Sequence, residues 1–309
     1  MSQFDSLLNA IPDNPKTAFI LSDYLEEQGD PRCDMLRLSY TLKDVLEITP
    51  ERLAKEERLR ELILVEGLEP VVPTYTNEIG MEFVWIPPGK FLMGSPEDET
   101  ERGDNETQHE VTLTKGFWLQ RTAVTQSQWE QVMGDNPSEF QDPELPVELV
   151  SWFDCEEFCQ KLSERTSRKT VLPSEAQLEY ACRAGTTTPF WFGTTISTKQ
   201  VNYEGDESEN GADEEESKGP TVHVRSFRPN GWGLYQMHGN VWEWCQTWHE
   251  NYTQEPRVDP VGPTKGDFRI YRGGSWAYNA ASCRSGYREG CDPDLSNDDL
   301  GLRCVLAPE

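Results

Sequence analysis

The chain has 309 residues and a formal net charge of −27, with 55 acidic and 28 basic side chains. This charge argues against nucleic acids and anionic membrane surfaces as partners, because both would be repelled. No segment is apolar over the length that a membrane-spanning helix requires, and the first residues lack the basic start of a secretory signal. We therefore expect a cytoplasmic protein whose eight cysteines are mostly thiols.

Residues 1–70 have the pattern of a small helical module. Apolar residues recur at helical spacing in three stretches, and Gly29-Asp30-Pro31 separates the first two. The third stretch, Glu51–Leu64, is dense in charges of both signs and is expected to be an exposed helix. The block of residues 10–32 resembles a short helical repeat-companion module found at the N-termini of unrelated bacterial proteins. That resemblance implies an accessory or docking role and no chemistry.

A change of composition marks the start of a second unit. Residues 71–80 contain proline, threonine and asparagine without hydrophobic periodicity, which is typical of a linker. From Met81 onward the chain is rich in tryptophan, glycine and turn residues. We therefore divide the chain into a helical module (1–70), a linker (71–80) and a large domain (81–309).

Three short amphipathic helices in the large domain are predicted from their first residues. Each begins with a serine or threonine that is followed three residues later by a side chain able to return a hydrogen bond. The pairs are Thr125 with Gln128, Ser151 with Asp154, and Ser174 with Gln177. Gly185 is expected to end the third helix in the left-handed conformation. Short β-like runs are predicted at residues 82–86, 110–113, 117–119 and 268–272.

The large domain also contains a specific succession of motifs. In chain order they are residues 83–95 (FVWIPPGKFLMGS), 150–152 (VSW), 172–185 (LPSEAQLEYACRAG), 229–244 (PNGWGLYQMHGNVWEW), 271–276 (YRGGSW), 283–288 (CRSGYR) and 300–304 (LGLRC). Together, in this order, they resemble the formylglycine-generating-enzyme family, also called sulfatase-modifying factors. The resemblance spans nearly the whole chain after the linker. It implies an irregular α+β fold related to that of C-type lectins.

Members of that family differ in function, so the fold does not settle what this chain does. Some oxidise a sulfatase cysteine to formylglycine with copper and oxygen, and others build sulfur-containing small molecules with an iron site on a separate domain. Others are non-catalytic binding surfaces. The helical iron domain is absent from this sequence, and its four histidines show no zinc or iron spacing.

In the catalytic relatives, two cysteines five residues apart form the copper site shortly after a Gly-Gly-Ser turn. The resemblance places these positions at Tyr278 and Cys283, with Ser275 at a further site position. A phenol does not replace the soft thiolate that suits Cu(I), so one ligand is missing and copper is not expected. A register counted back from Cys304 would move Cys283 off the second position. Cys291 is the alternative source of a second thiolate.

Cys159 and Cys304 are interpreted as structural residues. In secreted relatives, the positions of Cys159 and Cys304 form a disulfide. In a reducing compartment, we expect both to be buried thiols that pack as small apolar side chains.

The resemblance also implies two calcium sites built from oxygen ligands, which is the chemistry of a hard cation. The first would use Asn202, the Tyr203 carbonyl, Glu216 and the Lys218 carbonyl. The second would use Gln236, the Gly239 and Val241 carbonyls, and Glu243. Gln236 and Glu216 each depart from the family's usual residue. We expect one calcium ion to hold the long loop after residue 201, and the alternative is that Glu243 only hydrogen-bonds a loop.

From these observations we expect a non-catalytic binding or accessory protein whose partner is another protein. Its recognition loop would be residues 276–297, which mix Tyr, Asn, Ser, Arg and Asp as adaptable binding loops do. The alternative is a copper- and oxygen-dependent enzyme that generates formylglycine on a sulfatase Cys-x-Pro-x-Arg segment. Ser275 and Cys283 favour the enzyme, and Tyr278 opposes it. A third hypothesis is that the helical module docks the large domain onto a bacterial assembly.

Overall fold

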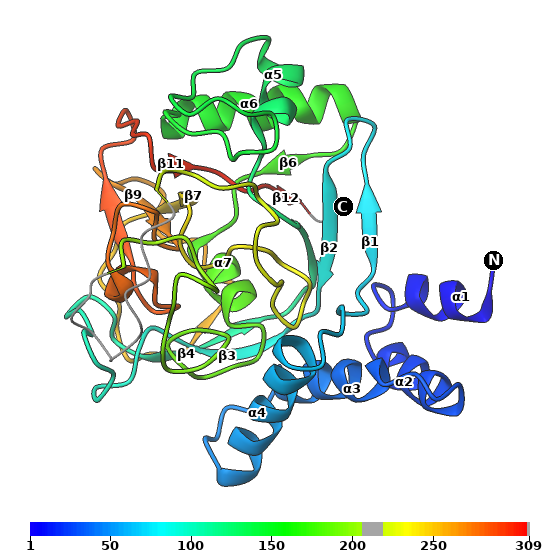
Figure 1. The fold of residues 1–309 in the computed structure, drawn as a ribbon. Helices are drawn as coiled ribbons and strands as arrows, with labels where there is room; N and C mark the ends of the chain where they lie inside the picture. Colours follow the sequence, from blue (N-terminus) through cyan, green and yellow to red (C-terminus); the bar gives the residue numbers. More distant parts are fainter. Residues whose placement is uncertain (206–218, 308–309) are drawn as a thin grey trace.

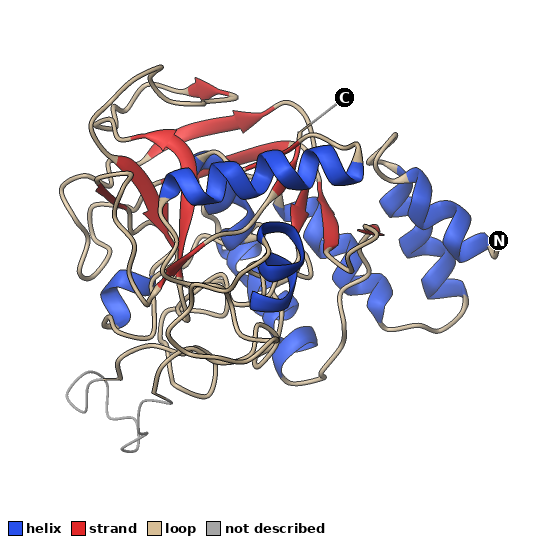
Figure 2. Ribbon diagram, turned by 90° about the horizontal axis from the view of Figure 1, so that it is seen from above, coloured by secondary structure: helices blue, strands red, loops and turns tan. Residues whose placement is uncertain are grey.

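The computed structural model describes residues 1–205 and 219–307, and it shows a mixed domain of helices and small sheets with a group of helices against one side (Figure 1). The expected α+β class is confirmed. The N-terminus lies at the outer end of the helical group (Figure 2). Among the described residues, no helix combines the length and the apolar composition needed to cross a membrane.

The helical module consists of four helices that pack on one another. They are α1 (Gln3–Ala10), α2 (Thr17–Glu27), α3 (Arg32–Leu42) and α4 (Pro50–Leu64). The predicted break is confirmed, because Gly29 takes a positive φ of 70° between α2 and α3. Ile11, Leu21 and Leu36 form part of the module's own buried cluster.

Helix α4 attaches the module to the large domain. The sequence predicts that α4 is exposed, and this is wrong for the face that carries Arg52 and Glu56. Arg52 and Glu56 are 5% and 0% exposed and form an ion pair at 2.8 Å. Arg52 donates to the Gly185 carbonyl at 2.7 Å, and Glu56 accepts from the Thr187 backbone and hydroxyl at 3.1 and 3.0 Å. We call these contacts the Arg52–Glu56 junction.

Apolar side chains continue the same contact. Met35 of α3 and Leu59 and Leu62 of α4 are buried in one cluster with Phe190 and Trp191 of the large domain. Module and domain therefore share part of a hydrophobic core.

The strands of the large domain form three sheets (Figure 1). The first has the order β1 (Thr74–Thr76), β2 (Glu82–Ile86), β5 (Phe117–Gln120), β12 (Val305–Leu306) and β6 (Thr170–Val171). The second has the order β10 (Glu289–Cys291), β9 (Arg269–Arg272), β7 (Trp242–Trp248) and β11 (Leu300–Gly301). The third has the order β3 (Gly89–Met93), β4 (His109–Leu113) and β8 (Arg257–Val258). The four predicted β-runs are confirmed at β2, β4, β5 and β9, whereas β1 lies in the stretch expected to be a linker.

The three predicted capping boxes are confirmed at the starts of the remaining α-helices. These are α5 (Gln126–Met133), α6 (Trp152–Thr166) and α7 (Glu175–Arg183). Gly185 has a φ of 89°, and Ala184 before it is also left-handed with a φ of 45°. Helix α7 is almost wholly buried and lies at the centre of the domain (Figure 1).

Helix α7 also carries two acidic side chains into the interior, where arginines from later segments meet them. Glu175 pairs with Arg288 at 2.7 Å and with Arg272 at 3.2 Å. Glu179 pairs with Arg183 at 2.9 Å and with Arg272. This cluster ties the C-terminal third of the chain to the central helix.

Candidate functional site

The two positions of the expected copper pair lie in different surroundings. Tyr278 is 44% exposed, whereas Cys283, at the end of a short 3-10 helix (Ala280–Cys283), is 0% exposed. The ring of Tyr278 meets the ring of Trp242 edge-on at 5.3 Å. The phenol is thus accessible at the surface, whereas the thiol is enclosed. Within the described ranges, no group of three or more His, Cys, Asp or Glu side chains is placed to hold a metal ion.

Cys283 has the environment of a packed structural residue. A Cβ built on Gly274 would come within 2.5 Å of its Sγ, so the thiol fills the space beside the Gly-Gly-Ser turn. Burial, with a smaller effect from Cys182, raises the pKa of the Cys283 thiol to about 12. The protonated thiol is a poor metal ligand and a poor nucleophile.

His238 fixes the backbone at the same place. Its Nε2 accepts a hydrogen bond from the Trp191 N–H at 3.2 Å, so its Nδ1 is the donor to the Cys283 carbonyl at 2.7 Å. Burial lowers the pKa of His238 to about 4 against the opposing effect of that hydrogen bond. His238 is thus a neutral structural group at neutral pH.

Cys291, the alternative source of a second thiolate, does not pack with Cys283. Cys291 is half-buried at the end of β10, and it packs on a different hydrophobic cluster from Cys283. Burial, then Asp292 and Glu289, raise the pKa of Cys291 to about 12. Cys159 and Cys304 are buried free thiols whose sulfurs lie 3.8 Å apart.

Ser275 makes a structural contact. Its hydroxyl donates to Asp299 Oδ2 at 2.7 Å, and both residues are buried. Burial raises the pKa of Asp299 against the opposing effect of this hydrogen bond, and Asp298 adds to the rise. The Asp299 carbonyl accepts from the Trp242 N–H at 2.8 Å. Ser275 thereby ties the Gly-Gly-Ser turn to the strand that begins at Leu300.

An aromatic surface that the sequence did not reveal surrounds Trp242. The rings of Tyr271, Tyr278 and Tyr287 lie 5.1, 5.3 and 5.7 Å from the Trp242 ring. We call these three residues the tyrosine surface. Its members come from β9, from the loop after the Gly-Gly-Ser turn and from the segment before β10, so only the fold brings them together. Partial burial, then Asp299 and Glu289, raise the pKa of Tyr278.

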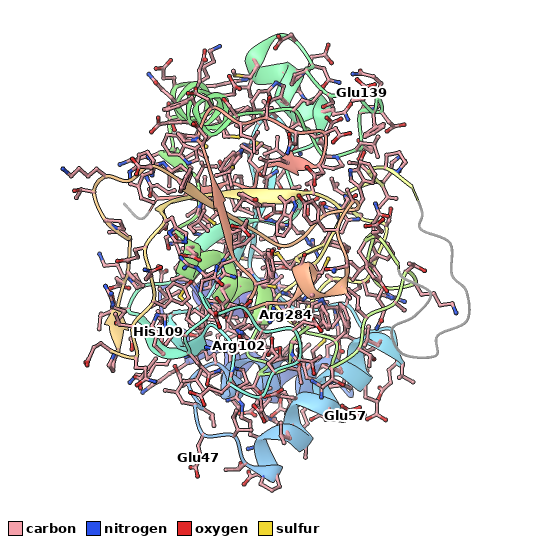
Figure 3. The ribbon with its side chains drawn as sticks, turned by 90° about the vertical axis from the view of Figure 1, so that its left-hand side faces the viewer. Glu47, Glu57, Arg102, His109, Glu139 and Arg284 are labelled. Atoms are coloured by element: carbon pink, nitrogen blue, oxygen red, sulfur yellow. The ribbon has the colours of Figure 1, made fainter. Side chains whose placement is uncertain are left out.

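The expected recognition loop is only partly at the surface. Residues 277–281 and 294–297 are exposed or half-buried, whereas residues 282–286 and 288 are buried. Arg284 points inward, where it pairs with Glu99 at 2.6 Å and Glu106 at 2.8 Å. Figure 3 shows Arg284 beside the loop that carries Arg102. The available recognition surface is therefore the two ends of the segment and the tyrosine surface between them.

Half of the first expected calcium site is described. Glu216 and Lys218 lie outside the described residues, and Asn202 and Tyr203 are buried. The Asn202 amide donates to the Pro220 carbonyl at 3.0 Å and to Asn240 at 3.2 Å. Its Oδ1, and Thr221 Oγ1 in the loop that it contacts, are buried without a hydrogen-bond partner among the described residues. Two orphaned buried oxygens fit a hard cation.

The residues of the second expected site come together in one turn, and its two side-chain ligands have protein partners. Gln236 accepts from the Asn240 amide at 2.7 Å and donates to the His223 carbonyl at 2.9 Å. Both oxygens of Glu243 accept hydrogen bonds from Arg303. Gly239 lies between them with a φ of 69°, followed by Asn240 and Val241. These contacts engage the side chains of both Gln236 and Glu243.

Comparison with known proteins gives consistent matches over the large domain. Residues 69–308 match the family model described as "Sulfatase-modifying factor enzyme 1-like domain". The chain is 33% identical over 206 residues to the formylglycine-generating enzyme of Mus musculus, which covers 64% of this chain and 53% of that protein. The chain thus spans about half the length of this curated relative.

Two solved structures share the fold. Treponema denticola variable protein 1 superposes with a TM-score of 0.66 at 28% identity, over 77% of this chain and 100% of that one. PvdO from Pseudomonas aeruginosa has the same TM-score at 30% identity, over 75% of this chain and 97% of that one.

Proposed function

The chain belongs to the family of sulfatase-modifying factor enzyme 1-like domains, and we propose that it is a non-catalytic member that binds a protein partner through a calcium-stiffened scaffold. The observation that carries this proposal is the difference in exposure between Tyr278 and Cys283, at 44% and 0%. An exposed phenol stands at the first copper position, and the cysteine expected at the second is enclosed with its proton retained at neutral pH. A phenol and a protonated, buried thiol do not fit copper, which supports a member of the family that does not carry out the copper-dependent reaction.

The binding part of the proposal rests on how the recognition segment is held. Arg284 and Arg288 anchor its middle to buried glutamates, and Ser275 and Asp299 join its two ends. The exposed residues of the segment are therefore held in place by buried ion pairs and by the Ser275–Asp299 hydrogen bond. A surface that is ordered before binding loses less conformational entropy when a partner docks.

Calcium fits the first expected site better than the second. Asn202 Oδ1 and Thr221 Oγ1 lack partners among the described residues, whereas the Glu243 oxygens are taken by Arg303. Asn202 and the Tyr203 carbonyl would hold the ion together with the residues that follow. The ion would supply positive charge and rigidity close to Glu204, whose N–H donates to the Tyr278 carbonyl at 2.9 Å.

The enzyme hypothesis is tested by direct assay. The reduced protein is incubated with Cu(I), oxygen and a Cys-x-Pro-x-Arg peptide, and the peptide mass is measured. We expect no conversion, either for the wild type or for Cys283→Ser and Cys291→Ser variants. Conversion of the peptide by the folded protein, lost in either variant, would overturn the proposal and establish a formylglycine-generating activity.

A further inference from the structure

We propose that the tyrosine surface receives a cationic side chain, an arginine or lysine, from a basic segment of the partner protein. This inference deepens the proposed function and rests on it. It starts from the charges of residues 276–298, which are the recognition loop and the residue that follows it.

Both basic side chains of this segment, Arg284 and Arg288, are buried, and all of its charged side chains at the surface are acidic. Arg284 and Arg288 are 4% and 1% exposed and are neutralised by buried glutamates. The acidic residues at the surface are Glu289, Asp292 and Asp294, which are exposed, and Asp298, which is half-buried. An acidic surface attracts basic partners and repels acidic ones. The local charge therefore selects a basic segment.

Tyr278 offers an aromatic face within this acidic surface. The residue is 44% exposed. Its ring packs edge-on against the buried ring of Trp242, and this contact holds the tyrosine ring in position. Asp299 and Glu289 are close enough to raise its pKa further after burial has done so. A cation over such a ring gains both from the ring quadrupole and from the nearby carboxylates.

Other tyrosines of the chain show the contact that Tyr278 lacks. Guanidinium groups stand over the rings of Tyr75 at 4.4 Å, Tyr252 at 3.8 Å and Tyr235 at 5.2 Å. Over the parts of the chain that the structure describes, no arginine or lysine stands over Tyr278 in this way. Its exposed face is an open acceptor for a cation, and arginine suits it best because its planar group also stacks on a ring.

The test uses a short fluorescein-labelled peptide of alternating glycine and arginine, titrated with the full-length protein and followed by fluorescence anisotropy. Tyr278→Ala is expected to weaken binding about five-fold, the effect of losing one cation–π contact. Tyr278→Phe keeps the ring and is expected to bind like the wild type. Because Tyr278 is 44% exposed, its replacement is expected to leave the fold intact, which circular dichroism verifies.

Phe153 provides the matched control. It is 47% exposed on α6 and is followed by Glu156 and Glu157, so Phe153→Ala removes an aromatic ring of similar exposure near similar charges. We expect that variant to bind the peptide with unchanged affinity. Equal binding by the wild type, Tyr278→Ala and Phe153→Ala would show that the attraction is spread over the acidic chain, and no binding at all would also overturn the inference. Neither result bears on the formylglycine assay, which decides the proposed function separately.

Discussion

Arg303 holds both carboxylate oxygens of Glu243 in the interior, with nitrogen–oxygen distances of 2.8 to 3.1 Å. The same guanidinium donates to the carbonyls of Gln120, Arg121 and Tyr235. One side chain therefore links β5, the turn before Trp242 and the last strands of the chain. The ion pair with Arg303 gives Glu243 a structural role.

Replacement of Arg303 by methionine is expected to lower the free energy of unfolding by about 3–5 kcal/mol, because it leaves a buried carboxylate without its counter-charge. Urea denaturation measures this change. The double variant with Glu243→Gln is expected to recover part of the loss. If the single variant unfolds at the wild-type urea concentration, Glu243 has another source of compensation.

Calcium is expected to raise the melting temperature measured against EDTA by about 5 °C at a hundred-fold excess over its Kd, because it binds the folded state alone. Asn202→Ala is expected to abolish this increment, and Gln236→Ala to preserve it. The increment is the quantity to compare, since Asn202→Ala also removes hydrogen bonds to Pro220 and Asn240. The opposite pattern in the two variants would move the ion to the turn that contains Glu243.

Iodoacetamide is expected to modify Cys291 first in the native protein, since the other seven cysteines are buried. Its thiol has a pKa of about 12, so the rate should be low at pH 7 and rise about ten-fold per pH unit up to pH 9, in step with the thiolate fraction. Mass spectrometry identifies the modified residue, and Cys291→Ser removes the signal. Faster labelling of Cys283 would mean that the Gly-Gly-Ser turn opens.

The cluster around Glu175 is expected to make the protein sensitive to acid. Burial alone would raise the pKa of Glu175, but Arg288, Arg272 and the Tyr252 hydroxyl outweigh it and lower the pKa to about 2. A carboxyl whose pKa is lower in the folded state stabilises that state above its unfolded pKa, and the contribution is lost as the pH falls towards 2.

For this carboxyl the contribution at neutral pH is roughly 3 kcal/mol. The difference in unfolding free energy between the wild type and Glu175→Gln should therefore shrink by about that amount between pH 7 and pH 2. Guanidinium titrations at several pH values measure it. A difference that does not depend on pH would show that Glu175 acts only through its hydrogen bonds.

The sequence predicts those features that neighbouring residues determine. Capping pairs such as Thr125 with Gln128 and Ser174 with Gln177 act within one helical turn, and they identified the helix starts correctly. Gly185 likewise ended α7 as expected. Strand β7 was missed because its residues are buried on both faces, which removes the alternation that identifies a strand.

Features that depend on distant segments were not predicted. The charge pattern of α4 indicates an exposed helix, yet its Arg52 and Glu56 find partners more than a hundred residues away. The tyrosine surface and the Ser275–Asp299 contact also join separate segments. The residue types at Tyr278 and Cys283 can be read from the sequence, but their burial cannot, and burial distinguishes a metal ligand from a packed side chain.

The Arg52–Glu56 junction has a consequence for any complex that the chain forms. Because Arg52 and Glu56 bind the backbone at Gly185 and Thr187, we expect the helical module to keep a fixed position relative to the large domain. Partners held at the module and at Tyr278 would face each other at a constant distance and angle. The two binding sites would then be a constant distance apart. Only a partner whose own two contact sites match that distance would bind more tightly by engaging both.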